Sequence, residues 1–163
     1  MDQAPDPASK TQKEPSPFQV VGWREMAALP DWGIPHILAK VDTGARTSAV
    51  HVETLEELGD DRIRFDVVVR EQPKHIVQTV EADVVRWSKV RPSFGDGHVR
   101  PVVRTRLQLG PWERVVEIGL VRRSGMLCRM LIGREAMQGL LVDPHRRYAL
   151  TDSPTTLKRR SRS

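Results

Sequence analysis

The chain lacks several features that would assign it to a common class of protein. Its 163 residues include one cysteine, Cys128, so an intrachain disulfide is excluded and a reducing cytoplasm is the expected setting. No apolar run approaches the roughly 20 residues that cross a bilayer. The first residues have neither the basic start nor the apolar stretch of a signal peptide. These absences predict a cytoplasmic protein with no membrane partner.

Signatures of metal and cofactor sites are missing as well. The sequence has no His-Glu-x-x-His helix, no Gly-x-Ser-x-Gly nucleophile elbow and no glycine-rich phosphate loop. Its five histidines are scattered singly, and one cysteine does not anchor a thiolate site. His51 and Glu53 could offer two ligands on one side of a strand, although an ordinary surface pair is the simpler interpretation. We therefore expect no metal and no cofactor.

The basic excess is confined to one end of the chain. The net charge is +5, and four of the last six residues are cations: Lys158, Arg159, Arg160 and Arg162. A nucleic-acid-binding fold spreads its basic excess over a folded face, so nucleic acid is not the expected partner. Residues 152–163 are predicted to be a basic, disordered tail, which could still touch a phosphate backbone or an acidic surface.

The rest of the chain is organised as one domain of short strands. Residues 1–17 are polar and proline-rich and are expected to be disordered, which leaves 18–151 as the folded domain. Period-two alternation and turn residues recur about every ten positions, as in barrels and sandwiches. Helical turns are expected only at Glu53–Leu58 and Arg134–Gln138. The expected strands are 18–23, 37–41, 62–69, 76–80, 103–109, 115–120, 130–133, 140–142 and 148–150.

One aspartate stands out because of its setting. The apolar run 37–41 leads directly into Asp42, Thr43 and Gly44. Glycine permits a tight turn that brings the carboxylate close to a partner, and the threonine hydroxyl can hold the loop by bonding to nearby backbone. Such a turn suits acid proteolysis, although Asp-Thr-Gly also forms ordinary turns. A paired-carboxylate mechanism needs two aspartates, so the second must come from another copy of the chain.

A second apolar segment could support this loop. Leu131, Ile132 and Gly133 precede the short helical candidate and could form a rigid, low-dielectric floor beside Asp42. Two carboxylates held together in such a place cannot both ionise and share a proton. One then acts as general base on a water molecule while the other protonates or polarises the scissile carbonyl.

Four segments occur in an order that resembles a known family. They are Val21-Gly22-Trp23-Arg24-Glu25, Ala39 to Ala49 with Asp-Thr-Gly-Ala-Arg-Thr-Ser at its centre, Arg100-Pro101-Val102-Val103 and Leu131-Ile132-Gly133-Arg134-Glu135. Together, over roughly residues 18–150, they resemble the bacterial retropepsin-like family often labelled ATP-dependent zinc protease. The resemblance implies a closed, retropepsin-like β-barrel with one or two short helices that works as a homodimer. It also implies an association with ATP-grasp ligases that join glutamate to peptides or proteins.

Residue roles follow from the same resemblance. Asp42, Thr43 and Gly44 match the catalytic loop, and Leu131-Ile132-Gly133 match the supporting floor. Ala45 and Arg46 are expected beside a peptide or protein substrate. Arg46 stands where other retropepsins usually have an acidic residue, so it could select acidic or glutamate-rich peptides. It could instead lower the pKa of Asp42, or pair with an acidic neighbour that holds the loop.

The segment 91–101 contains two glycines, an aromatic residue and flanking prolines. It is either a plain surface hairpin loop or a mobile cover that grips the substrate through Phe94, Gly95 and Gly97. The primary hypothesis is therefore a homodimeric aspartic peptidase with one Asp42 from each subunit. The alternatives are a non-catalytic peptide-binding module that partners an ATP-grasp ligase, and a zinc peptidase as the family label suggests.

Overall fold

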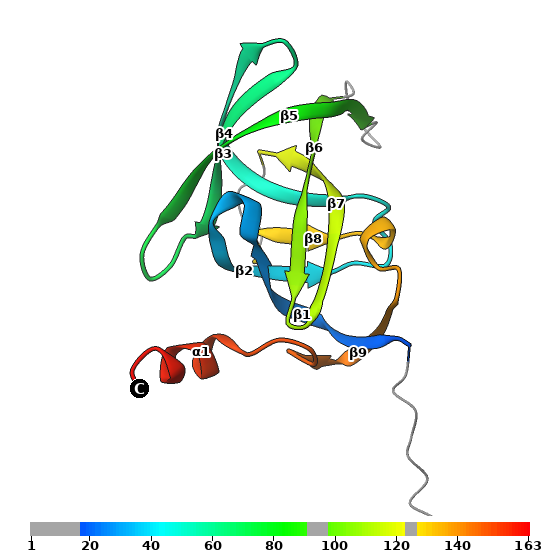
Figure 1. Ribbon diagram of the computed structural model, residues 1–163, viewed down its shortest axis with the longest axis vertical. Coiled ribbons are helices and arrows are strands. Elements are labelled where there is room, and N and C mark those ends of the chain that lie inside the picture. The colour runs from blue at the N-terminus through cyan, green and yellow to red at the C-terminus, as the bar shows by residue number, and fades with distance from the viewer. Residues whose placement is uncertain (1–16, 91–97, 123–126) are drawn as a thin grey trace, which may run out of the picture.

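The computed structural model describes residues 17–90, 98–122 and 127–163 (Figure 1). Nine strands and two short 3-10 turns, η1 and η2, lead to a single α-helix within these ranges. The strands are β1 (Gln19–Leu29), β2 (Ile34–Val41), β3 (Ser48–Gly59), β4 (Arg62–Arg70), β5 (Ile76–Val90), β6 (His98–Leu109), β7 (Trp112–Val121), β8 (Met130–Ile132) and β9 (Leu140–Arg147). The other elements are η1 (Pro30–Trp32), η2 (Arg134–Ala136) and α1 (Pro154–Arg160).

The described strands belong to one sheet in the order β4-β5-β6-β7-β3-β8-β2-β1-β9. Two further pairings, β3 with β4 and β1 with β6, fold this sheet back on itself. The all-β prediction is confirmed. The closed barrel that the family resemblance implied is the finer part of that expectation and stays a prediction. The short strand β8 lies between β3 and β2, which places the segment before η2 beside the end of β2 (Figure 1).

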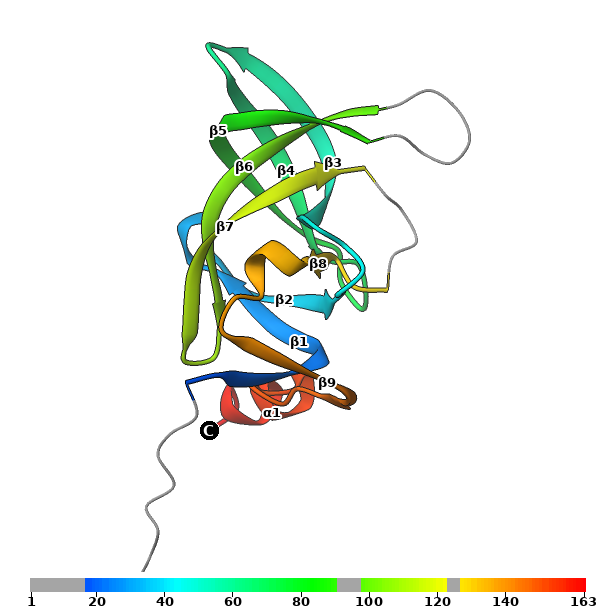
Figure 2. The ribbon, with the colours of Figure 1, turned by 90° about the vertical axis from the view of Figure 1, so that its right-hand side faces the viewer.

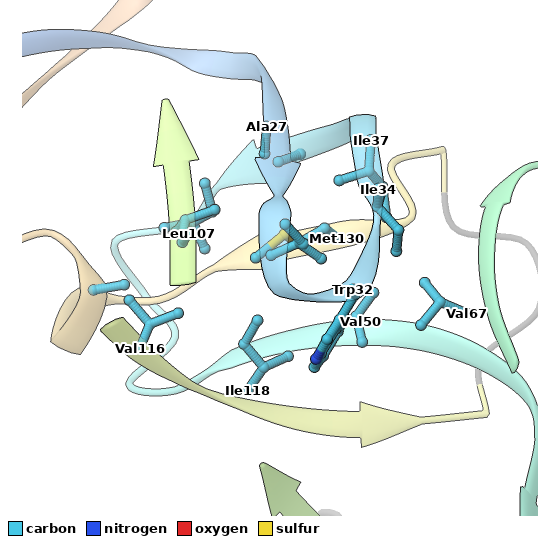
Figure 3. Packing of buried hydrophobic residues seen from close by; sticks show 14 of the residues in the cluster. Ala27, Trp32, Ile34, Ile37, Val50, Val67, Leu107, Val116, Ile118 and Met130 are labelled. Atoms are coloured by element: carbon cyan, nitrogen blue, oxygen red, sulfur yellow. The ribbon is translucent and has the colours of Figure 1, made fainter. Parts of the chain in front are cut away.

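The core is formed where the folded sheet faces itself. Burial alternates along most of β2, β4 and the second half of β6, as the period-two pattern predicts, whereas the last four residues of β7 are all buried. Figure 3 shows branched side chains from these strands packed around Met130 of β8. Trp32 and Phe65 meet edge to face with ring centroids 5.3 Å apart. The buried side chains of β8 thus connect the end of β2, which leads into Asp42, to the centre of the core.

The acidic run Glu53–Leu58 is a strand, and the helix predicted there is wrong. Its composition favours a helix, but the run lies within β3 and pairs with β4 in antiparallel register. Leu55 faces Phe65, and Glu56 faces Arg64 with an ion-pair distance of 3.1 Å. Cross-strand packing and charge pairing therefore outweigh local propensity.

The C-terminal residues are also ordered, contrary to the disordered tail predicted for 152–163. The hydroxyl of Ser153 caps α1 by accepting a hydrogen bond from the Thr156 amide at 3.2 Å. Asp152 and Arg160 form an ion pair across the helix. In both ribbon views α1 lies beside β9 at one end of the molecule (Figure 2). No helix in the described part of the chain is long and apolar enough to span a bilayer.

Candidate active site

Asp42 lies at the first position after β2, where the chain leaves the sheet. Its amide donates to the Ile132 carbonyl at 2.9 Å, which continues the parallel pairing of Val41 with Ile132. The Gly44 amide donates to Asp42 Oδ1 at 2.9 Å, and the Ala45 amide closes the turn on the Asp42 carbonyl at 3.2 Å. A backbone amide thus orients one carboxylate oxygen of a half-buried side chain.

The turn leaves most of its polar groups accessible. Thr43 and Gly44 are exposed, and the bond from Gly44 is the only hydrogen bond to the Asp42 carboxylate among the described residues. The Thr43 hydroxyl, which we expected to hold the loop, has no hydrogen-bond partner among the residues that the structure describes. The Thr43 carbonyl instead accepts a bond of 3.0 Å from Arg134 Nη1. The second oxygen of Asp42 is therefore available to water, a substrate or another carboxylate.

The segment Leu131-Ile132-Gly133 lies directly beside this turn. Ile132 is fully buried, Leu131 is half-buried and pairs with Lys40 of β2, and the Gly133 amide donates to the buried Ser48 Oγ at 3.1 Å. A Cβ on Gly133 would lie 2.6 Å from the Thr47 carbonyl carbon, so only glycine allows this close approach. The chain after Asp42 and the chain after β8 are thus packed backbone to backbone.

The 3-10 turn η2 ties the loop down from the other side. The Arg134 amide donates to the Ala45 carbonyl at 2.8 Å, and the Glu135 amide donates to the Arg46 carbonyl at 3.1 Å. Arg46 Nε and Glu135 Oε1 add an ion pair at 2.8 Å. The acidic neighbour considered for Arg46 is therefore Glu135. Sequence reasoning missed Ser48 and the roles of Arg134 and Glu135, although all three lie within the quoted motifs.

The remaining predicted site residues are less informative. Ala45 is half-buried in the turn, whereas Phe94, Gly95 and Gly97 lie outside the described residues. His51 is buried with Nδ1 3.3 Å from the Val121 carbonyl, and Glu53 forms an ion pair with His75, so the two side chains do not converge on one ligand. No three His, Cys, Asp or Glu side chains are grouped as metal ligands in the described ranges.

Comparison with curated proteins gives relatives that are much longer than this chain. A protein named probable alpha-L-glutamate ligase from Shewanella pealeana is 36% identical over 137 residues, which are 80% of this chain and 30% of the relative. A protein of the same name from Parasynechococcus marenigrum is 37% identical over 137 residues, which are 82% of this chain and 29% of the relative. The chain spans less than a third of the length of these relatives.

A solved structure and a family profile cover nearly the whole domain. The crystal structure of a Legionella pneumophila protein of unknown function aligns with a TM-score of 0.67 and 27% identity, covering 81% of this chain and 98% of that one. The profile of the RimB-like family, described as retropepsin-like aspartic endopeptidase RimB, matches residues 20–153. The chain therefore belongs to the RimB-like family of retropepsin-like aspartic endopeptidases.

Proposed function

We propose that this protein is an aspartic endopeptidase whose dyad consists of Asp42 from each of two subunits. One observation carries the proposal. Asp42 lies on a turn that is hydrogen-bonded to β8 and η2, and this turn is exposed at Thr43 and Gly44. A loop held this firmly can present a carboxylate in one geometry. Its exposure leaves room for an identical loop related by a two-fold axis.

The chemistry requires the two carboxylates to behave as a pair. Side by side they cannot both ionise, so one holds a proton while the other is charged. The charged Asp42 removes a proton from a water molecule, which attacks the scissile carbonyl carbon. The protonated partner hydrogen-bonds to the carbonyl oxygen and later supplies the proton that the leaving amine requires. The Gly44 amide and the ties to Arg134 keep each carboxylate in position.

Acidic or glutamate-rich peptides are the proposed substrates. Relatives matched by this chain carry the name alpha-L-glutamate ligase, and a hydrolase that acts on the products of glutamate addition would oppose such an enzyme. An ATP-grasp ligase is accordingly the proposed functional partner. The pairing of Arg46 with Glu135 favours a structural role for Arg46, so substrate selection has to come from other cations.

A second candidate function has an observation in its favour. In the curated relatives the matching region forms only 29–30% of a protein named as a ligase. A domain in that context could bind a peptide for the ligase without cutting it. This alternative keeps the same exposed turn but assigns no proton transfer to Asp42.

Hydrolysis of a glutamate-rich peptide by wild-type protein and by Asp42→Asn separates the two functions. Asparagine keeps the shape of the side chain and removes the ionisable group, so we expect cleavage to fall by at least about 100-fold while peptide affinity persists. The non-catalytic function predicts equal binding and no cleavage by either protein. Activity that survives Asp42→Asn, or that a chelator abolishes in a protein found to contain metal, would favour the zinc peptidase instead.

A further inference from the structure

Three cations lie in register on neighbouring strands beside the active turn. Lys40 of β2 pairs with Arg24 of β1, and Arg24 pairs with Arg147 of β9. We call these three residues the cation row. Lys40 and Arg147 are exposed and Arg24 is half-buried. Lys40 precedes Asp42 by two positions, so the row begins roughly 7 Å along the chain from Asp42 and on the same side of the extended backbone.

No carboxylate of the described residues forms an ion pair with any member of the cation row. Several arginines elsewhere in the sheet have cross-strand carboxylate partners. Arg64 of β4, for example, lies 2.8 Å from Glu81 and 3.1 Å from Glu56. Like charges that face each other across strands are destabilising, so three unpaired cations in register call for a compensating anion.

The guanidinium of Arg24 has a buried N–H group that could donate to a ligand. This guanidinium lies over the Trp23 ring, with Cζ 4.6 Å from the ring centroid, and its buried Nε has no hydrogen-bond partner in the described ranges. The Arg24 guanidinium also faces the Cys128 side chain, and stacking on an aromatic face leaves its other in-plane N–H groups for a carboxylate. A buried N–H without a partner is costly unless a ligand or water satisfies it.

The position of Arg147 beside Arg24 requires a close backbone approach and an unfavourable backbone conformation. A Cβ on Gly22 would lie 2.4 Å from the Arg146 carbonyl oxygen, so β9 approaches β1 closely only because residue 22 is glycine. Tyr148, which follows Arg147, has a φ of 54°, and its amide donates a hydrogen bond to the Arg24 carbonyl at 2.8 Å. A bulky residue in the left-handed region is uncommon and is found most often where function requires it.

We propose that the cation row binds an acidic segment of a peptide substrate next to the catalytic turn. The inference rests on the proposed function for the substrate and adds the residues that select it. Three adjacent strands span roughly 10 Å, which is the length of about three residues of an extended peptide. Because the side chains of an extended peptide alternate, the first and third of these residues could place carboxylates on Lys40 and Arg147 while neighbouring residues reach Asp42.

Binding can be measured without cleavage in the Asp42→Asn background. The probes are a fluorescein-labelled oligoglutamate and its glutamine counterpart of equal length, read by fluorescence anisotropy. The double variant Lys40→Gln/Arg147→Gln should weaken oligoglutamate binding by roughly 3- to 30-fold, as expected for the loss of two exposed ion pairs, and should reduce its salt dependence. The matched control Lys74→Gln/Arg159→Gln removes two exposed cations that lie outside the row and should leave the affinity unchanged.

The outcomes separate this inference from the proposed function. If the unaltered protein cleaves peptides while the row variant and its control bind oligoglutamate equally, the cation row is not the selecting surface. If only the row variant loses affinity but the unaltered protein cleaves nothing, the binding inference stands and the peptidase proposal fails. Tighter binding of an oligonucleotide of equal charge to the row would overturn the acidic-peptide assignment.

Discussion

Arg46 and Glu135 join the chain after the Asp42 turn to the chain after β8 through an ion pair of 2.8 Å. The Glu135 amide also donates to the Arg46 carbonyl at 3.1 Å, so the side chains and the backbones of the two residues are both connected. The pair is largely exposed, which limits its contribution to global stability to at most about 1 kcal/mol. Its main effect is local, on the geometry of the turn that carries Asp42.

Reversing the charge at one member of this pair should loosen the turn. Arg46→Glu places two carboxylates together, so we expect peptidase activity to fall by roughly 3- to 10-fold on acidic and neutral peptides alike. The swap Arg46→Glu/Glu135→Arg should restore most of that loss. A loss confined to acidic peptides, unchanged by the swap, would instead show that Arg46 contacts the substrate directly.

Gly133 should not tolerate a side chain. In Gly133→Ala the new Cβ would lie 2.6 Å from the Thr47 carbonyl carbon and 2.8 Å from the Arg46 oxygen, and both are backbone atoms that cannot move aside cheaply. We expect a loss of about 1–3 kcal/mol in the free energy of unfolding, measured by urea denaturation. Gly119→Ala is the matched control, because its Cβ would lie 3.6 Å from the Ser48 oxygen, an ordinary contact. Equal effects of the two substitutions would contradict the close-packing interpretation.

Glu25 anchors the C-terminal segment and should be sensitive to loss of its charge. Its fully buried carboxylate accepts hydrogen bonds from the amides of Gly22, Ala149, Leu150 and Thr151, and from the Thr151 hydroxyl. In Glu25→Gln one oxygen becomes an NH2 donor that faces other donors, so a destabilisation of about 2–4 kcal/mol is expected. Hydrogen exchange should show lost protection at residues 149–151. Retained protection there would mean that the segment is held by other contacts.

Stability should also decline in acid through Asp66. Hydrogen bonds from the Thr79 hydroxyl at 2.6 Å and the Thr54 hydroxyl at 2.9 Å lower the pKa of this carboxyl below its ordinary value of 3.8. The unfolded chain then binds a proton at Asp66 more readily than the folded protein does. The stabilisation that Asp66 gives the fold is therefore present at pH values above this ordinary pKa and is lost as the pH falls below it. Thermal unfolding as a function of pH should show a shallower acid decline in Asp66→Asn. An unchanged slope would assign the acid sensitivity to other groups.

The strands could be predicted well where one face is buried and less well elsewhere. The alternation in Arg62–Arg70 places Phe65 and Val67 in the core, as the structure confirms. The predicted strand at 76–80 extends to Val90, because the second half of β5 is too exposed to show a clear apolar pattern. The bonds from residues 149–151 to Glu25 could not be predicted, because Glu25 lies about 125 positions away in the sequence.

The candidate site depended on more than periodicity. The strand and turn around Asp42 pointed to this residue, and Ile132 was expected beside it because paired carboxylates need a hydrophobic floor. No local pattern reveals that the Ser48 hydroxyl bonds to Gly133, 85 positions away. The cation row was hidden for the same reason, since Lys40, Arg24 and Arg147 become neighbours only through strand register.

Mixing wild-type and Asp42→Asn subunits tests the shared dyad most directly. The two proteins are unfolded and refolded together so that subunits pair at random, and peptide cleavage is measured against the wild-type fraction. If each active site needs both carboxylates, only wild-type dimers cleave, and an equal mixture retains about a quarter of the activity. If each subunit acts alone, or the protein is a monomer, activity falls in proportion and an equal mixture retains about half. A quadratic dependence is the predicted result, and a linear one would contradict the shared Asp42 mechanism.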